Sequence, residues 1–300
     1  LWGPAHEMGH QHQQLLNMRG LTEVSNNMFS NVAVWYDGRG TSRTNSGQGD
    51  LSNVLEAYNT DGHDFFTNNI WAQTQMFYKL WLYYHLVGKN TNFVPRLIEM
   101  LRRDPMIIQY DQLGSTSLLH FYKKTCEAAG EDLTDFFRAH GFFEVMDKRL
   151  VEDYSDAKYT QTQADIDEAI NYIKAKGYPE NRQIIFINDN AQNVTYLKHD
   201  GVTARKLWDG KAFADLGSYT AYQNAGESPI IGTYRLTLNG NEVTLTGAEG
   251  GVGFLIYDKD GKLLAFSNDY TFPVNEATAA ALASGTATVL AVTGSGETVE

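Results

Sequence analysis

The chain has 300 residues, 42% of them hydrophobic and 20% charged, and carries a formal net charge of −12. This composition is typical of a folded globular protein and excludes a disordered one, and the length favours two structural units. The acidic balance opposes binding to nucleic acid, no apolar run is long enough for a transmembrane segment, and the single cysteine, Cys126, excludes a disulfide framework and cysteine-rich metal sites.

The chain begins Leu1-Trp2-Gly3-Pro4, and its most informative motif follows almost at once, from His6. Neither an initiator methionine nor a signal peptide precedes that motif. We therefore expect a fragment of a longer protein, so that the missing targeting sequence says nothing about the compartment of the parent.

Residues 1–150 are expected to be mostly helical. Residues 70–87 repeat bulky apolar side chains at three- and four-residue spacing and end at Gly88. Further amphipathic helices are expected at residues 93–101, 115–129 and 133–140. Residues 37–50 are rich in Gly, Ser and Asn, and we expect a functional or mobile loop there. An aromatic row at helical spacing is more typical of a core than of a sugar-binding surface, and this one contains Trp71, Phe77, Trp81 and Tyr84.

The second half changes character after a helix expected at residues 163–176. Residues 183–188 have the pattern of a buried strand, and alternating segments flank Asn239-Gly240 and Asp260-Gly261, which are strong hairpin signals. Residues 286–292 supply a last strand. We expect an α+β multidomain protein, with a mostly α-helical subdomain over residues 1–150, a connecting helix within residues 151–182 and a β-sandwich-like C-terminal module over residues 183–300.

The motif that carries chemistry is His6-Glu7-Met8-Gly9-His10, which fits the pattern H-E-x-x-H. On a helix, residues four apart share a face, so both imidazoles can reach one metal ion. Glu7 lies beside them, where it can take a proton from a metal-bound water.

Glu23 is the candidate for a third ligand. Gly20 can end one helix and Thr22 can cap the next, so an antiparallel helix pair would bring Glu23 back over the two histidines. Two imidazoles and a carboxylate leave a fourth zinc position open, as in catalytic sites. Asn27 lies one turn beyond Glu23 and is a candidate to bond the outer nitrogen of a ligand histidine.

These segments resemble the M60 (enhancin-like) zinc metallopeptidases. HEMGHQHQ at residues 6–13 is similar to the family's H-E-x-G-H-x-x-Q, and GLTEVSNNMFS at residues 20–30 is similar to its T-E-V-x-N-N segment, with 12 residues between His10 and Glu23. Residues 71–86 and 132–142 are similar to the family's downstream helices. The close resemblance covers about residues 1–145.

The resemblance implies a gluzincin-type zinc endopeptidase, bacterial and either secreted or located at the cell surface. Its substrates would be mucin-like O-glycosylated proteins, with contact to their carbohydrate. Carried over by position, His6, His10 and Glu23 would bind Zn²⁺ and Glu7 would be the general base that activates zinc-bound water. A second donor to the oxyanion is expected in this class, and the candidates are His63, Tyr58 and Tyr36.

Two alternatives from other classes stay open. One is a non-catalytic adhesion protein that binds glycan or mucin on a relic zinc fold, although the intact Glu7 argues against it. The other is a zinc enzyme with a different scissile bond, such as an aminopeptidase, which would require a free N-terminus on its substrate. Four other histidines are expected to have surface, packing or helix-dipole roles, namely His12, His85, His120 and His140.

Overall fold

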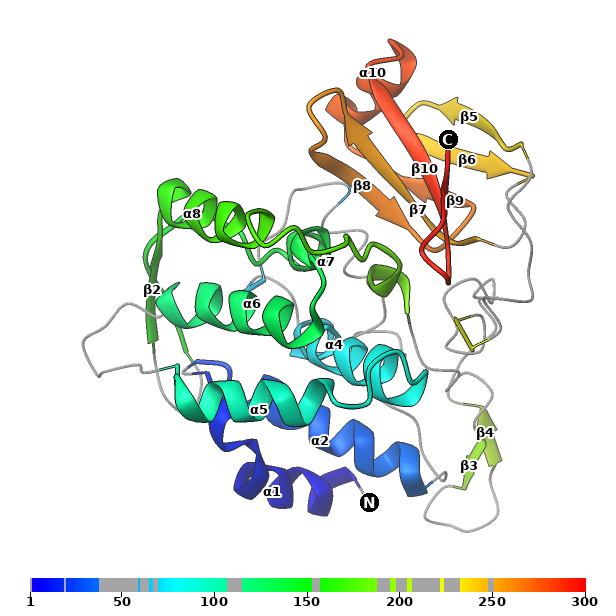
Figure 1. The fold of residues 1–300 in the computed structure, drawn as a ribbon. Coiled ribbons are helices and arrows are strands. Elements are labelled where there is room, and N and C mark those ends of the chain that lie inside the picture. Colours follow the sequence, from blue (N-terminus) through cyan, green and yellow to red (C-terminus); the bar gives the residue numbers. More distant parts are fainter. Residues whose placement is uncertain are drawn as a thin grey trace.

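The computed structural model describes residues 2–18, 20–37, 59, 65–66, 70–106, 115–152, 157–187, 195–197, 204–206, 222–223, 233–247 and 251–300. Helices dominate the first half of these residues and antiparallel sheets the last third, so the predicted α+β architecture is confirmed. In Figure 1 the helical part lies below and the C-terminal sheets lie above it. The loop predicted at residues 37–50 falls, after Asp37, outside the described residues.

The helices of the first part agree closely with those predicted. They are α1 (Trp2–Gln13), the 3-10 turn η1 (Gln14–Leu16), α2 (Thr22–Asp37), α4 (Ile70–Trp81), the π turn η4 (Leu82–Leu86), α5 (Phe93–Arg103), α6 (Ser115–Ala129), α7 (Thr134–Ala139) and α8 (Gln163–Lys174). α8 starts with a capping box in which Thr162 and Asp165 bond each other's backbone amides. Within the described ranges, no helix combines the length and apolar character that crossing a membrane requires.

The aromatic row of α4 and η4 lies mostly in the core, as expected. Phe77, Trp81 and Tyr84 are buried, whereas Trp71 is half-buried and meets Trp2 edge-on, with ring centroids 5.6 Å apart. Cys126 is also buried, and burial raises the pKa of its thiol, so it behaves as a small hydrophobe.

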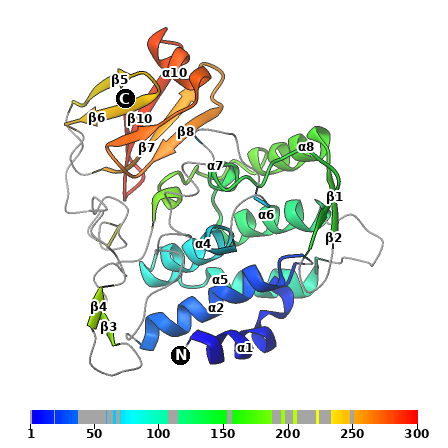
Figure 2. The ribbon, with the colours of Figure 1, turned by 180° about the vertical axis from the view of Figure 1, so that it is seen from behind.

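A β-hairpin that the sequence did not predict follows α7. Strands β1 (Met146–Val151) and β2 (Ala157–Gln161) pair antiparallel, and Figure 2 shows them at one edge of the helical part. β1 has a mixed exposure pattern with a register shift rather than clean alternation, so it carries little strand signal. The hairpin packs on the turn between α1 and α2, where Val151 would lie 3.2 Å from a side chain added at Gly20.

The prediction of a buried strand at residues 183–188 is wrong, because the structure forms the 3-10 helix η5 (Gln183–Phe186) there. A short apolar run does not distinguish a buried strand from a buried helical turn. Side chains from other elements satisfy this backbone instead of a neighbouring strand: Lys79 donates to the carbonyl of Ile185, and the Tyr222 hydroxyl donates to the carbonyl of Gln183.

The C-terminal strands form two sheets. One has the order β5 (Arg235–Asn239), β6 (Glu242–Thr246) and β9 (Thr271–Pro273), and the other has the order β11 (Thr298–Val299), β10 (Ala287–Thr293), β7 (Gly251–Asp258) and β8 (Leu263–Ser267). Helix α10 (Glu276–Ala283) precedes β10, and the short pair β3 (Thr195–Leu197) and β4 (Ala204–Lys206) lies apart. Both predicted hairpins are confirmed, with Gly240 and Gly261 at positive φ in their turns. The predicted domain boundaries stay predictions.

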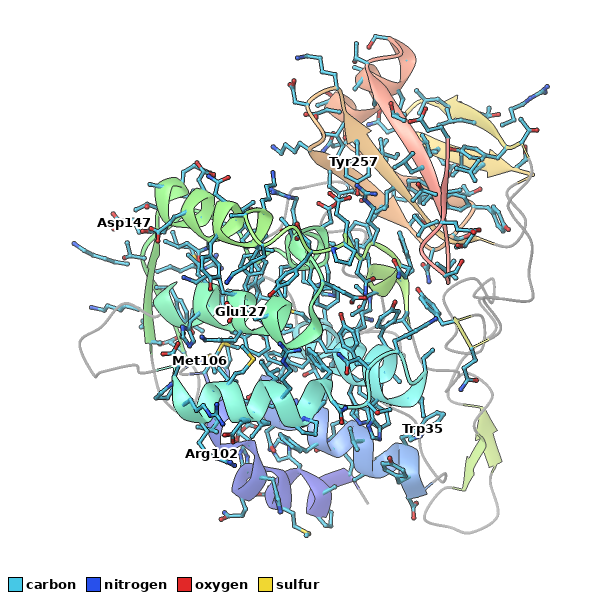
Figure 3. All side chains as sticks on the ribbon, viewed as in Figure 1. Trp35, Arg102, Met106, Glu127, Asp147 and Tyr257 are labelled. Carbon is cyan, nitrogen blue, oxygen red and sulfur yellow. The ribbon has the colours of Figure 1, made fainter. Side chains whose placement is uncertain are left out.

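The central strand β7 is buried on both faces of its sheet. Phe254 and Ile256 join the core between the two sheets, whereas Leu255 and Tyr257 join the core of the helical part. The Tyr257 hydroxyl donates to Asp135 Oδ2 over 2.6 Å, and Figure 3 shows Tyr257 where the sheets meet the helices. Both faces being covered explains why this strand is almost continuously apolar.

The packing of η5 against this sheet is close. A side chain added at Gly253 would lie 2.2 Å from the ring of Phe186, so the ring occupies the space that any other residue at position 253 would fill. The backbone and amide of Asn59 also bond Phe266 and Asn275 of the C-terminal part. The C-terminal sheets are therefore docked on the helical part by specific contacts.

Lys79 gives a pH-dependent test of this packing. It is fully buried on α4, and burial lowers the pKa of its amine well below the ordinary lysine value. Between the pKa values of the folded and unfolded states the unfolded chain binds more protons, so the free energy of unfolding rises with pH. We expect Lys79→Met to flatten this rise between about pH 7 and about pH 9.5, below the range in which tyrosines ionise.

Urea unfolding at several pH values in that window measures the slope. Lys89→Met is the matched control, because Lys89 is exposed between η4 and α5 and the same substitution there should keep the wild-type slope. A Lys79→Met protein with the wild-type slope would contradict the assignment.

Candidate metal centre

The site lies between two antiparallel helices. α1 carries His6 and His10 one turn apart on the same face, and α2 carries Glu23 in its first turn. The chain reverses between them through η1 and Gly20, whose φ of +80° is the left-handed conformation that favours glycine. The structure therefore brings together the three residues that the sequence singled out as metal ligands.

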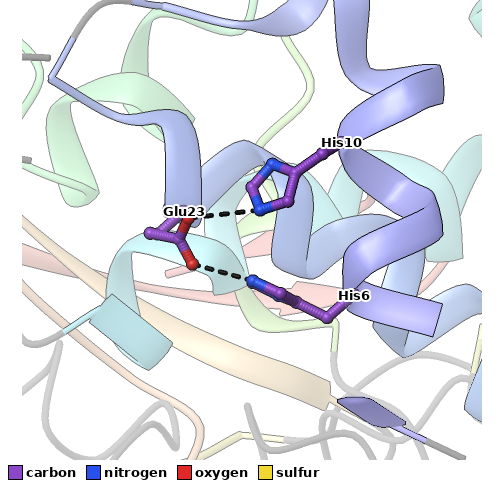
Figure 4. Close-up of side chains that lie close together, drawn as sticks. All are labelled: His6, His10 and Glu23. Atoms are coloured by element: carbon purple, nitrogen blue, oxygen red, sulfur yellow. Dashed lines mark ion pairs between the residues drawn. The ribbon is translucent and has the colours of Figure 1, made fainter. Parts of the chain in front are cut away.

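The three side chains converge closely (Figure 4). His6 Nε2 lies 2.8 Å from Glu23 Oε2, and His10 Nε2 lies 3.3 Å from Glu23 Oε1. One ligand atom from each residue can be chosen such that all three lie within 4.8 Å of one another. All three are partly exposed, so the site is reached from solvent.

The ring nitrogen of each histidine that points away from Glu23, Nδ1, faces an amide oxygen. His6 Nδ1 lies 3.0 Å from Asn27 Oδ1, and His10 Nδ1 lies 3.0 Å from Gln13 Oε1. An oxygen acceptor there favours a proton on Nδ1, which leaves Nε2 of a neutral ring with a lone pair. Two lone pairs then face the oxygens of one carboxylate, and only a shared cation or proton stabilises that arrangement. The donor set fits a borderline metal ion such as zinc.

Glu7, the candidate base, follows His6 on α1 and is exposed to solvent. His63 and Tyr58, two candidate oxyanion donors, lie outside the described residues. The third candidate, Tyr36, is 13 residues beyond Glu23 on the same helix, about 20 Å along its axis. Its hydroxyl lies 3.2 Å from His85 Nε2, so Tyr36 is not positioned to act at the site.

Two buried residues that sequence reasoning did not assign hold the helices together. Asn26 on α2 donates to the backbone carbonyl of His6 over 2.9 Å. A side chain added at Gly9 would lie 2.1 Å from Asn26 Oδ1, so the absence of a side chain at position 9 allows this approach. Gln13 is the second, and its amide bonds the carbonyl of Thr22 on α2. Because residues three apart on a helix are neighbours, the sequence could have indicated the contact between Gln13 and His10.

A pocket of about 350 Å³ opens beside Glu23. Its walls come from the first turn of α2, the start of α4 and strand β1, so elements far apart in the sequence meet there. It combines apolar side chains with one cation, Arg149. The lining residues are Gly20, Glu23, Val24, Phe66, Ile70, Gln73, Arg149, Leu150, Val151 and Glu152.

Three further histidines of the described structure have the ordinary roles expected of them. His140 is buried and bonds the carbonyl of Phe136, and His120 lies 2.8 Å from the carbonyl of Asp104. His12 is exposed on α1 and its ring lies 2.9 Å from the carbonyl of Met8. Of the described His, Cys, Asp and Glu residues, only His6, His10 and Glu23 form a group of three that could hold a metal ion.

Two family models match the chain. The model of peptidase M60, enhancin and enhancin-like, matches residues 1–141, and that of the peptidase M60 C-terminal domain matches residues 233–300. Comparison with proteins of curated function found no match.

Several solved structures are similar to the chain. A metallopeptidase from Bacteroides thetaiotaomicron is 28% identical with a TM-score of 0.79, and the match covers 99% of this chain and 48% of that one. A metallopeptidase in complex with Tn antigen is 29% identical with a TM-score of 0.78, covering 99% and 53%. The M60 catalytic domain from Clostridium perfringens ZmpC, in complex with the sialyl T antigen, shares the fold at 16% identity and a TM-score of 0.54, covering 100% and 49%. The chain thus spans about half the length of these structures.

The close approach of α1 to α2 can be tested at Gly9. We expect Gly9→Ala to lower the free energy of unfolding by about 1–3 kcal/mol, because the added methyl group collides with Asn26 and must displace its buried side chain or the helix that carries it. Urea or thermal unfolding measures the change. Gly3→Ala on the same helix, where an added Cβ meets nothing within 4 Å, is the control and should be neutral or slightly stabilising. Equal effects of the two substitutions would show that Gly9 does not serve the helix contact.

Proposed function

The chain belongs to the peptidase M60 family, a family of metallopeptidases, and we propose that it carries the catalytic site of a zinc-dependent endopeptidase that cleaves mucin-like O-glycosylated proteins. The observation that carries the proposal is the convergence of His6, His10 and Glu23 next to the acid Glu7. Two imidazoles and one carboxylate would hold the ion and leave a position open, which is the arrangement of catalytic rather than structural zinc sites.

When bound, zinc would supply a Lewis acid that activates water and polarises the scissile carbonyl. Glu7 is the proposed general base: its carboxylate takes a proton from the attacking water and delivers it to the leaving amine. The exposure of Glu7 on α1 leaves room for substrate beside it. Asn27 would keep the His6 ring oriented through its contact with Nδ1. His63 stays the proposed oxyanion donor.

The proposed substrate class rests on the comparisons and on the pocket. A metallopeptidase 29% identical to this chain has been solved in complex with Tn antigen, which supports contact with a glycan. The pocket beside Glu23 would take the substituent of a residue next to the scissile bond, because it opens at a proposed metal ligand. Since mucin-like glycoproteins are extracellular, we propose that the enzyme is secreted or displayed on the bacterial surface.

We propose the domain organisation that the sequence predicts. Residues 1–150 would supply the catalytic subdomain, residues 151–182 the connection and residues 183–300 the C-terminal module. No contact in the described part of the chain specifically favours the adhesion alternative, and the presence of Glu7 beside the two histidines argues against it.

The metal site is tested by metal content. We expect the purified chain, after incubation with zinc and desalting, to hold about one zinc ion, measured by elemental mass spectrometry. His10→Ala should lose it, because two ligands no longer hold the ion tightly. His12→Ala is the matched control, because it makes the same change on the same helix. The His12 ring is exposed and lies against the carbonyl of Met8, so its removal should leave the metal content intact. Equal zinc in the two variants would sink the assignment of His10.

The role of Glu7 is tested by Glu7→Gln. We expect the variant to keep its zinc and to lose about 10²–10⁴-fold in hydrolysis rate, because the amide cannot accept the proton from water. The assay uses an O-glycosylated peptide blocked at its N-terminus, followed by mass spectrometry of the products, with the same peptide lacking its glycan as the control.

The outcomes separate the alternatives. If the chain cleaves the glycopeptide only when its N-terminus is left unblocked, it is an aminopeptidase. Equal cleavage of the blocked peptide with and without its glycan would remove the glycan from the proposal but leave the endopeptidase activity. Mucin binding that survives Glu7→Gln, with no cleavage by the wild-type chain, would favour the adhesion protein.

A further inference from the structure

The side chain of Gln13 lies directly behind His10, at the end of α1. It is 1% exposed, and its amide contacts the His10 ring and two groups on α2. We propose that Gln13 is a positioning residue that keeps the His10 ring oriented and protonated on Nδ1, so that Nε2 is free to bind the metal. This inference rests on the proposed metal site, although one arm of its test needs no metal.

Hydrogen-bond chemistry fixes which way the Gln13 amide points. Its nitrogen lies 2.6 Å from the backbone carbonyl of Thr22 and 2.8 Å from Ser25 Oγ. A carbonyl oxygen only accepts, so the NH₂ group must be on that side of the amide. The Ser25 hydroxyl can accept the second proton, because it donates its own hydrogen to the carbonyl of Leu21 over 3.3 Å. Both amide protons are thereby used.

The remaining amide atom, Oε1, faces His10. It lies 3.0 Å from Nδ1, and an oxygen without hydrogen can only accept there. The ring must therefore present N–H at Nδ1, and in the neutral ring the lone pair falls on Nε2, which points at Glu23. An amide turned the other way would place its nitrogen against Nδ1 and favour a proton on Nε2, the atom that must coordinate.

The same amide also ties the two ligand-bearing helices together. Thr22 is the first residue of α2 and Glu23 is the second, so Gln13 bonds the backbone adjacent to one proposed ligand while it orients another. Asn27 makes the equivalent contact to His6 from α2. The two histidines thus each have a buried amide behind them, and the nitrogen of the Gln13 amide also bonds two groups of α2.

The test compares Gln13→Met with Gln11→Met. Met is similar to Gln in length but has neither the acceptor nor the donors, and Gln11 is exposed on the same helix. Zinc affinity is measured by competition with a chromophoric chelator. We expect Gln13→Met to bind zinc about 10–100-fold more weakly, and Gln11→Met to bind like the wild type. Ser25→Ala, which removes one of the two acceptors of the Gln13 nitrogen in a small and conservative change, should give a smaller loss in the same direction.

A second readout separates positioning from a merely structural role. Nitrogen-15 NMR of the metal-free protein reports which ring nitrogen of His10 carries the proton. We expect Nδ1 in the wild type, a shift toward Nε2 in Gln13→Met, and no change at His6, whose partner Asn27 is intact. Unchanged zinc affinity in Gln13→Met, or a His10 ring that keeps its proton pattern, would overturn the proposal.

The two failures are distinguishable. If the wild-type chain binds no zinc, the proposed function fails, and the NMR comparison still decides whether Gln13 sets the protonation of His10. If Gln13→Met does not fold, the affinity and the NMR spectrum of Ser25→Ala decide instead, and wild-type values in both would reject the role of Gln13.

Discussion

The distance between α1 and α2 is the constraint on which the candidate metal centre depends. Two imidazoles come from one helix and the carboxylate from the other, so their ligand atoms meet only when the helices are in close contact. Gly9 permits that contact because it has no side chain, and Asn26 occupies the space that a side chain at position 9 would fill. Asn26 also bonds the backbone carbonyl of His6. Gln13 makes a second buried link. A buried amide that loses its partner is costly, so sliding one helix along the other would break several such bonds at once.

Support for α2 extends from this contact to the opposite end of the molecule. α4 packs on α2, where the Thr74 hydroxyl bonds the carbonyl of Val24, and α4 also carries Lys79, which bonds η5. η5 in turn places the Phe186 ring against Gly253 of β7. Because β7 is buried on both of its faces, the C-terminal sheets share the core of the helices. They therefore help to hold the helices that carry the site.

One side of α1 is buried and the other is exposed, so the residues that support the proposed ligands and the proposed base lie on different sides of the helix. Gly9 and Gln13 are buried against α2, whereas Glu7 and Met8 are exposed. Buried amides thus contact the rings of both proposed histidine ligands, while the proposed base is exposed to solvent. The pocket beside Glu23 has a wall from β1, a strand that comes more than a hundred residues later in the chain.

The sequence by itself determined the features that depend on neighbours along the chain. The i, i+4 spacing of His6 and His10 places them on one helix face, Asn-Gly and Asp-Gly turns specify the two hairpins, and Thr162 starts α8, because each pattern acts through the local backbone. Only the tertiary structure decided which partner lies against each face. It formed a 3-10 helix at residues 183–186 that Lys79 and Tyr222 bond, placed Tyr36 against His85 instead of at the site, and bonded the Gln13 amide to α2. Burial and hydrogen bonding across long sequence separations leave no periodic mark in the chain, so these features had to be seen in three dimensions.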